Sequence, residues 1–162
     1  MPLVAWRITT KRDPGAAFDG EGARLYGGRW NRPGTRLVYA AEHLSLAALE
    51  LFVHVDPEDQ PSALFRFRVE LPDDALERLP RERLPASWRA YPAPDATTAL
   101  GTDWARRAEG LALVVPSVVI PEENNVLLNP AHPRFRKLEL GTGKPFSFDP
   151  RMWAKGAARR AR

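Results

Sequence analysis

Three polar side chains, Arg29, Tyr39 and Glu50, stand in segments whose composition otherwise predicts a hydrophobic core. Arg29 follows two glycines, and a backbone without Cβ atoms can approach a ligand closely. Tyr39 lies within the apolar run 37–41, and Glu50 interrupts the mainly apolar stretch 44–55. A buried carboxylate destabilises a fold unless it is paired, so a chain that keeps one there is expected to use it. These residues predict an enzyme.

The segments that must position these side chains predict an α+β domain. Strands are expected over Leu3–Thr9, Leu37–Ala41, Leu64–Glu70, Leu111–Ile120, Val126–Leu128, Phe135–Leu140 and Phe146–Phe148. Many short strands, one substantial helix and few alternating strand–helix–strand units are typical of this class.

Glu50 is expected on a helix over Ala41–Val55, which the following Asp-Pro pair would stop. A second, short helix is expected over Thr102–Glu109, ended by the glycine after it. The prolines clustered in 71–101 indicate short helical turns within an ordered but irregular excursion. Pro116 interrupts a predicted strand and favours an edge position or a bulge.

Length and composition predict one domain over 1–150, followed by a basic, flexible tail over 151–162. The chain contains no cysteine, which excludes disulfides, thiol nucleophiles and cysteine-based zinc sites. It has no run of about 18 apolar residues and no secretory signal pattern. We expect a soluble protein that stays in the cytoplasm.

The net charge of +4 and the pI near 9.8 raise the possibility of a nucleic-acid partner. Part of the positive charge comes from the tail, however, and the remaining body is close to neutral. Dispersed arginines suit a polyanionic small ligand about as well as a duplex. The sequence has no helix-turn-helix, zinc finger or aromatic RNA-binding strand motif, so direct DNA binding is not expected.

The polar stripe of the predicted helix contains His43, Glu50 and His54. A Glu50–His54 pair one turn apart would be a surface pair that contributes tenths of a kcal/mol. The same two residues could chelate a metal, but His43 would lie about 16 Å from His54 at about 1.5 Å per residue, too far to complete the site. Only His132 remains as a third histidine, so no metal is expected.

Several short motifs carry, in their order, a resemblance to a known family. They are Trp6-Arg7-Ile8, Gly27-Gly28-Arg29-Trp30-Asn31, Val38-Tyr39-Ala40-Ala41-Glu42, Ala47-Ala48-Leu49-Glu50, Val115-Pro116-Ser117-Val118-Val119-Ile120-Pro121 and Asn125-Val126-Leu127-Leu128-Asn129-Pro130-Ala131-His132-Pro133. This succession resembles the RES domain, which is named for its Arg, Glu and Ser and comprises toxins of bacterial RES–Xre toxin–antitoxin pairs. The resemblance runs from about residue 6 to residue 140.

The resemblance implies an ADP-ribosyltransferase-like (diphtheria-toxin-like) fold, a mixed sheet core with flanking helices, and NAD as the substrate. It implies that Arg29, Tyr39 and Glu50 are catalytic. It further implies that Arg7, Arg29, Tyr39 and Ser117 bind NAD. It also implies a partner, a cognate Xre-like antitoxin protein that restrains the toxin.

The chemistry of these residue types agrees with cleavage of the nicotinamide–ribose bond. The leaving group departs neutral from a pyridinium, so little acid assistance is needed while the ribose becomes an oxocarbenium ion. Glu50 could supply a fixed negative charge facing that cation. Arg29 and Arg7 could clamp the pyrophosphate through bidentate guanidinium forks. Tyr39 could stack on the nicotinamide or adenine ring, or simply pack within its strand.

Ser117 has a less direct expected role. No Ser/His/Asp order supports a nucleophile, so we assign Ser117 to positioning either substrate or Glu50. Asn125, Asn129 and His132 are expected to shape turns by bonding to local backbone. The glycine pair is not a Gly-x-Gly-x-x-Gly fingerprint, so a Rossmann dehydrogenase is not expected.

The leading hypothesis is a toxin that consumes NAD, and its acceptor is left open. Water would make it a glycohydrolase, phosphate a phosphorylase, and a protein side chain an ADP-ribosyltransferase. Two alternatives belong to other classes. One is an inactive binding or regulatory domain that keeps the NAD cleft, and the other is a basic nucleic-acid-binding protein.

Overall fold

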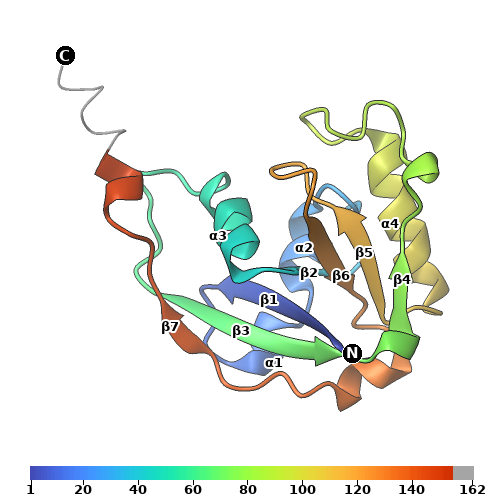
Figure 1. Ribbon diagram of the computed structural model, residues 1–162, viewed down its shortest axis with the longest axis horizontal. Helices are drawn as coiled ribbons and strands as arrows, with labels where there is room; N and C mark the ends of the chain where they lie inside the picture. The colour runs from blue at the N-terminus through green and yellow to red at the C-terminus, as the bar shows by residue number, and fades with distance from the viewer. Residues whose placement is uncertain (155–162) are drawn as a thin grey trace.

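The computed structural model describes residues 1–154, which form one seven-stranded mixed sheet with helices on both faces (Figure 1). The strands are β1 (Leu3–Thr9), β2 (Val38–Ala41), β3 (Leu64–Leu71), β4 (Leu76–Arg78), β5 (Ala112–Pro116), β6 (Asn124–Leu128) and β7 (Lys144–Phe146). The α-helices are α1 (Pro14–Ala17), α2 (Glu21–Tyr26), α3 (Leu44–Phe52) and α4 (Asp95–Arg107). Three 3-10 turns span Asp73–Ala75, Arg81–Arg83 and Pro133–Lys137. Within residues 1–154, no helix has the length and apolar character needed to cross a membrane.

The sheet has the order β4-β5-β6-β2-β1-β3-β7 and falls into two halves. Strands β1, β3 and β7 form one half, and β2, β6, β5 and β4 form the other. The ladder between β1 and β2 registers a single pair, Trp6↔Ala41, whereas β1 and β3 are paired along their whole length. Figure 1 shows the strands of the two halves running in different directions, so β1 and β2 diverge on either side of this one pair.

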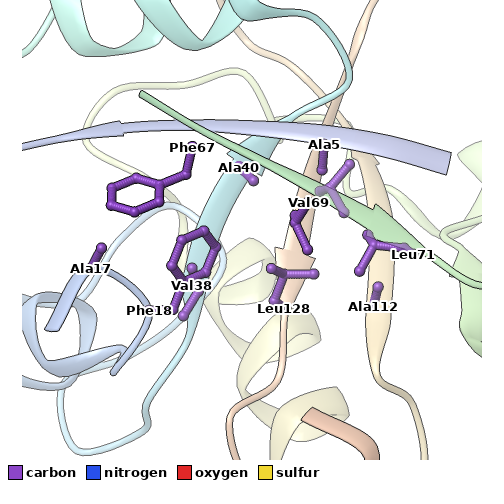
Figure 2. Close-up of a cluster of buried hydrophobic side chains, with 11 residues drawn as sticks. Ala5, Ala17, Phe18, Val38, Ala40, Phe67, Val69, Leu71, Ala112 and Leu128 are labelled. Atoms are coloured by element: carbon purple, nitrogen blue, oxygen red, sulfur yellow. The ribbon is translucent and has the colours of Figure 1, made fainter. Parts of the chain in front are cut away.

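One face of the sheet carries a hydrophobic cluster that joins both halves (Figure 2). Its members are Ala5, Ala17, Phe18, Val38, Ala40, Phe67, Val69, Leu71, Ala112, Val126 and Leu128. The rings of Phe18 and Phe67 meet edge to face, with centroids 5.4 Å apart, which anchors the segment after α1 against β3. Alternation along each strand places the intervening side chains on the opposite face.

The opposite face is covered by α3 over one half and α4 over the other. The cluster under α4 contains Trp30, Trp104 and Leu127, and the cluster under α3 contains Ile8, Ala41 and Leu46. Tyr39 packs against the first cluster and Ala41, two residues later on the same strand face, belongs to the second. The boundary between the two covering helices therefore runs along β2.

The helix that carries Glu50 is shorter than the expected Ala41–Val55. Ala41 pairs with Trp6 and with Asn125 in the sheet, so its backbone groups are not available to a helix. At the other end, the N–H of His54 bonds to the carbonyl of Leu51, a tightened turn that ends the α-helical geometry. The expected i, i+4 alignment of Glu50 with His54 is thus absent.

Most expected strands are confirmed, and β1 has the predicted bounds. The strand expected over Phe135–Leu140 is wrong, because this stretch begins within the 3-10 turn Pro133–Lys137. A proline in the first turn and the capping ring of His132 favour the turn. Its apolar residues still pack against the cluster of Figure 2. The three-residue strand β4 was not anticipated, since it carries no alternating pattern of its own.

Two further expectations are corrected near α4 and β5. The helix α4 begins earlier than expected and ends with Ala108 in a left-handed conformation (φ 53°), before the glycine expected to end it. Strand β5 ends at Pro116 and lies between β4 and β6, so it is not an edge strand. Strand β4 pairs only as far as Val114, so Pro116 lies beyond it and its missing N–H removes no ladder bond to β4.

The expected flexible tail begins with an anchored turn. Residues 151–154 are helical, and Trp153 packs against Phe52 of α3 and against Phe148, with ring centroids 4.9 and 5.4 Å away. These aromatic contacts join the four residues to the domain, and the flexibility expected of the tail stays a prediction. Residues 155–162 lie outside the described residues.

Candidate functional site

The carboxylate of Glu50 is held through one of its two oxygens. Glu50 lies in the last turn of α3, and its Oε1 accepts hydrogen bonds from Ser117 Oγ and Asn125 Nδ2, both at 2.7 Å. Within residues 1–154, Oε2 has no hydrogen-bond partner. Two short bonds to one oxygen fix the plane of the carboxylate while leaving the second oxygen for a ligand.

Ser117 follows the last residue of β5 and is fully buried. Its Oγ accepts the N–H groups of Val119 and Ile120, both at 3.0 Å. A hydroxyl has one proton and two acceptor positions, so these bonds direct the Ser117 proton to Glu50. Ser117 thus orients the Glu50 carboxylate, which is one of the two roles expected for it.

Asn125 has a different role from the one expected. The sequence suggested a turn residue bonded to local backbone, but Asn125 lies on β6 and donates to a carboxylate 75 residues away. Its register partner is Ala41 on β2, so its side chain shares the sheet face on which α3 lies. The neighbouring Asn124 donates instead to Glu42 at 3.1 Å. Alternation along β6 thus gives the two asparagines different acceptors.

Asn129 and His132 do bond to local backbone, as expected. Asn129 Oδ1 accepts the N–H of Ala131, and His132 Nδ1 accepts the N–H of Arg134. Asn129 also donates to the carbonyl of Ala105 in α4. These residues support the fold and lie outside the Glu50 site.

Arg29 is held in place through one nitrogen of its guanidinium group, Nη1. Its Nη1 donates to the carbonyls of Trp88 and Ala90, at 2.9 and 2.8 Å. Burial lowers the pKa of Arg29, and the charge of Glu50 is the largest influence in the opposite direction. No hydrogen bond within residues 1–154 engages Nε or Nη2. The group therefore keeps free donors in the electrostatic field of Glu50.

Tyr39 lies beneath the loop that carries Arg29. Its hydroxyl donates to Asn31 Oδ1 at 2.6 Å and accepts the N–H of Trp30 at 3.0 Å. Burial raises the pKa of Tyr39 above its ordinary value, so the phenol stays protonated. A Cβ on Gly28 would lie 2.6 Å from this hydroxyl, so the close approach that requires a glycine here is to Tyr39.

Asn31 is a site residue that sequence reasoning used only as part of a motif. Its side-chain nitrogen donates to three carbonyls, those of Ala23, Arg32 and Thr35, while its oxygen accepts from Tyr39. All of these bonds lie within a few residues of the glycine pair or connect it to β2. Asn31 therefore fixes the shape of the loop that presents Arg29. An asparagine directly after a tryptophan and close to the glycine pair was the available signal in the sequence.

Arg7 is not brought together with Tyr39 and Glu50 on one sheet face. It shares the face of Ala5, which belongs to the cluster of Figure 2. Its Nε donates to the carbonyl of Ala17 and its Nη1 to the carbonyl of Tyr39, both at 2.7 Å. Burial lowers its pKa to about 10, partly offset by Asp19. Arg7 thus connects β1 to β2 where their ladder has already ended.

A surface hollow lies away from this site. It has a volume of about 530 Å³ and lies beside β3, and its lining includes Arg68, Glu70 and Arg134. Arg68 is paired with Glu70 at 2.7 Å and Arg134 with Asp74 at 3.1 Å, so these guanidinium groups already have anionic partners. Within residues 1–154, no cluster of three or more metal-ligating side chains occurs. The chemistry favours the Glu50 site over this hollow.

Comparisons with known proteins match a part of the chain that includes the residues of this site. The family model described as "RES domain" matches residues 4–149. "Toxin Res" of Yersinia enterocolitica is 39% identical over 152 residues, covering 93% of this chain and 99% of that protein. "Prs ADP-ribosylating toxin" of Sphingobium sp. is 39% identical over 160 residues, covering 96% of this chain and 99% of that protein.

The fold also has a solved counterpart. A chain in the crystal structure of the M. tuberculosis MbcT–MbcA toxin–antitoxin complex superposes with a TM-score of 0.73 at 20% identity, covering 96% of this chain and 88% of the other. The expected α+β, ADP-ribosyltransferase-like fold is thereby confirmed. With the family model spanning nearly its whole length, the chain belongs to the RES domain family.

Proposed function

We propose that this protein is the toxin of a toxin–antitoxin pair and that it cleaves the nicotinamide–ribose bond of NAD. The observation that carries the proposal is Glu50, which has one oxygen fixed by Ser117 and Asn125 and the other without a partner within residues 1–154. The names of two relatives support the proposal. "Toxin Res" supports a toxin, and "Prs ADP-ribosylating toxin" supports a toxin that acts on NAD.

In the proposed reaction the bond between ribose C1 and the nicotinamide nitrogen breaks, and its electron pair leaves with the nicotinamide. The ribose becomes an oxocarbenium ion, which an acceptor then attacks while losing a proton. Glu50 Oε2 would accept a hydrogen bond from a ribose hydroxyl and would face the developing positive charge. Because Ser117 and Asn125 hold the carboxylate before substrate binds, little reorganisation is needed in the transition state.

Arg29 would bind the pyrophosphate of NAD. Its Nη1 is committed to the carbonyls of Trp88 and Ala90, which orients the plane of the guanidinium. The remaining Nη2 and Nε form one edge of the fork, the geometry that recognises two phosphate oxygens. Its position in the field of Glu50 is consistent with one ligand that spans both residues.

Tyr39 and Arg7 would support the NAD site from different places in the fold. Tyr39 supports the Arg29 loop, which is residues 27–37 between α2 and β2, through Asn31 and the N–H of Trp30. We therefore assign Tyr39 to the base of the NAD site. Arg7 was expected to contact NAD, but its guanidinium bonds to two main-chain carbonyls on the far face. We assign Arg7 to holding β2, and hence Tyr39, in place.

The partner proposed for this toxin is an Xre-like antitoxin, and its site of action is proposed to be cytoplasmic. A structurally similar chain occurs in a toxin–antitoxin complex, which supports a protein partner. An acidic segment or a C-terminal carboxylate of the antitoxin would suit the free donors of Arg29 and would compete with NAD. No metal is proposed for the reaction.

The test is to incubate the purified protein with NAD and to measure nicotinamide release. Mass analysis of the products with and without phosphate, and with and without cell extract, separates the acceptors. ADP-ribose alone indicates water, a phosphorylated ADP-ribose indicates phosphate, and a protein heavier by one ADP-ribosyl group indicates transfer. We propose a protein side chain as the first acceptor to examine, because the name of one relative describes an ADP-ribosylating toxin. Absence of nicotinamide release under all these conditions would reject the proposed activity.

A further inference from the structure

The segment between the 3-10 turn Arg81–Arg83 and α4, together with α4 itself, is fastened to the Arg29 loop by several contacts. Arg29 donates to two of its carbonyls, and Trp88 packs in the cluster under α4 with Trp30. The N–H of Arg32 bonds to Thr102 Oγ1 at 2.9 Å. Close packing adds to this, since a Cβ on Gly101 would lie 2.0 Å from the carbonyl oxygen of Trp30.

This segment, residues 84–94, lies at the same end of the sheet as the connection between β5 and β6 (Figure 1). Arg81 Nη2 donates to the carbonyl of Pro121 in that connection at 3.0 Å. The connection begins with Ser117, which holds Glu50. Segment 84–94, the Arg29 loop and the Glu50 carboxylate are therefore linked through named contacts into one rim.

Tyr91 projects from this otherwise well-fastened segment. It follows Ala90, whose carbonyl holds Arg29, and it is 88% exposed. Within residues 1–154 its ring has no hydrogen bond or aromatic contact. Burial lowers the pKa of Arg29, and Glu50, Tyr39 and then Tyr91 act on it in the opposite direction. A large aromatic side chain thus stands in water, one residue beyond a carbonyl that binds a guanidinium with free donors.

Tyr26 provides the internal comparison. It is 84% exposed and lies three residues before Arg29, at the end of α2. It is not among the groups that influence Arg29. Both tyrosines are exposed, whereas the link to Arg29 through Ala90 belongs to Tyr91 alone.

We propose that Tyr91 stacks on the adenine base of NAD while Arg29 binds the pyrophosphate. This inference rests on the proposed function. The pyrophosphate lies between the two halves of NAD, and the nicotinamide half must reach Glu50, so the adenine half extends from Arg29 away from Glu50. Tyr91 is the exposed aromatic side chain whose backbone neighbour holds Arg29. Nucleobases stack favourably on such side chains, which lose little conformational entropy on binding.

The test is ligand titration on a Glu50→Gln background, which removes turnover. The probes are NAD, ADP-ribose and nicotinamide mononucleotide, which has a phosphate but no adenine. Tyr91→Ala is expected to weaken NAD and ADP-ribose by about 5- to 150-fold, the range for loss of one base–aromatic stack. Binding of nicotinamide mononucleotide should not change. Tyr91→Phe keeps the ring and should retain affinity within about threefold, and Tyr26→Ala, the matched exposed tyrosine, should match the parent.

The outcomes separate this inference from the activity on which it rests. If the Glu50→Gln parent binds none of the probes, the proposed NAD site itself fails. If the parent binds NAD and Tyr91→Ala binds it equally well, the adenine assignment is rejected while the NAD site stands. Weaker nicotinamide mononucleotide binding with unchanged ADP-ribose binding would place the Tyr91 ring on the nicotinamide and would also reject the adenine assignment. Unchanged NAD affinity with lost antitoxin binding would also reject the adenine assignment and would place Tyr91 in a protein contact instead.

Discussion

The hydroxyl of Ser117 donates to Oε1 of Glu50 at 2.7 Å, across 67 residues of sequence. Two main-chain N–H groups already occupy the acceptor positions of that hydroxyl, so its one proton has a single destination. The connection after β5 and the last turn of α3 are thereby joined at the Glu50 carboxylate. Orientation of the carboxylate is built into the unliganded fold.

Replacement of Glu50 by Gln is expected to reduce nicotinamide release by roughly 10²–10⁴-fold, the effect of removing a preorganised charged group. The amide oxygen can still accept from Ser117 and Asn125, so the fold and much of the NAD affinity should remain. The melting temperature is expected to stay the same or rise, because a partly buried charge is removed. Steady-state assays and thermal unfolding measure both effects. Near wild-type turnover would show that Glu50 is not catalytic.

Asn125→Ala is expected to lower kcat with little change in KM. It removes one of two charge-assisted bonds to Glu50, worth about 1.5–3 kcal/mol, or roughly 10- to 150-fold if the carboxylate orientation matters only in the transition state. Asn124→Ala is the matched control, since this neighbour bonds to Glu42 at the same end of β6. Equal losses in both variants would mean that the effect comes from the strand and not from Glu50.

Arg29→Lys should weaken NAD binding by about 1.5–3 kcal/mol, because lysine keeps the charge but cannot bind two carbonyls and a phosphate through one planar fork. Isothermal titration on the Glu50→Gln background measures this without turnover. Arg32→Lys serves as the control, because Arg32 belongs to the same loop and is exposed. Unchanged affinity of the Arg29 variant would leave Arg29 as a residue that only ties the loop to Trp88 and Ala90.

Gly101→Ala is expected to destabilise the protein, whereas Gly22→Ala is not. Both glycines lie within helices, where alanine is intrinsically better by up to about 1 kcal/mol. A Cβ at Gly101 would meet the carbonyl oxygen of Trp30 at 2.0 Å, while a Cβ at Gly22 has nothing within 4 Å. The free energies of unfolding in urea, compared with wild type, should therefore change in opposite directions. A stabilised Gly101 variant would contradict the packing of α4 against the Arg29 loop.

Expression of the wild-type protein alone should arrest growth with a fall in cellular NAD or the appearance of ADP-ribosylated protein, and Glu50→Gln should not. Co-expression of the antitoxin should restore growth and shield Arg29 and Glu50 in a heteromeric complex. The competing explanation is toxicity through DNA binding by the basic surface. In that case the Gln variant stays toxic, and binding to DNA falls steeply between roughly 50 and 200 mM salt.

Elements with a strong local pattern could be predicted from their own residues. The alternation of β1 and β3, the apolar stretch of α3 and the β-branched run of β5 each encode their own period, so these elements were predictable. The order of short motifs also indicated the RES family, which the family model confirms over residues 4–149. Arg29, Tyr39 and Glu50 stood out because their polarity conflicted with apolar surroundings.

Which side chains meet at the site depends on how the elements pack in three dimensions. Sheet register places Asn125 opposite Ala41 and so beneath α3, and strand alternation places Arg7 on the far face. The carbonyls that hold Arg29 come from a proline-rich segment 59 and 61 residues later. Local patterns specify which face of an element is apolar, but not which distant element covers it. The donors around Glu50 and Arg29 therefore follow from packing that no short stretch of this sequence encodes.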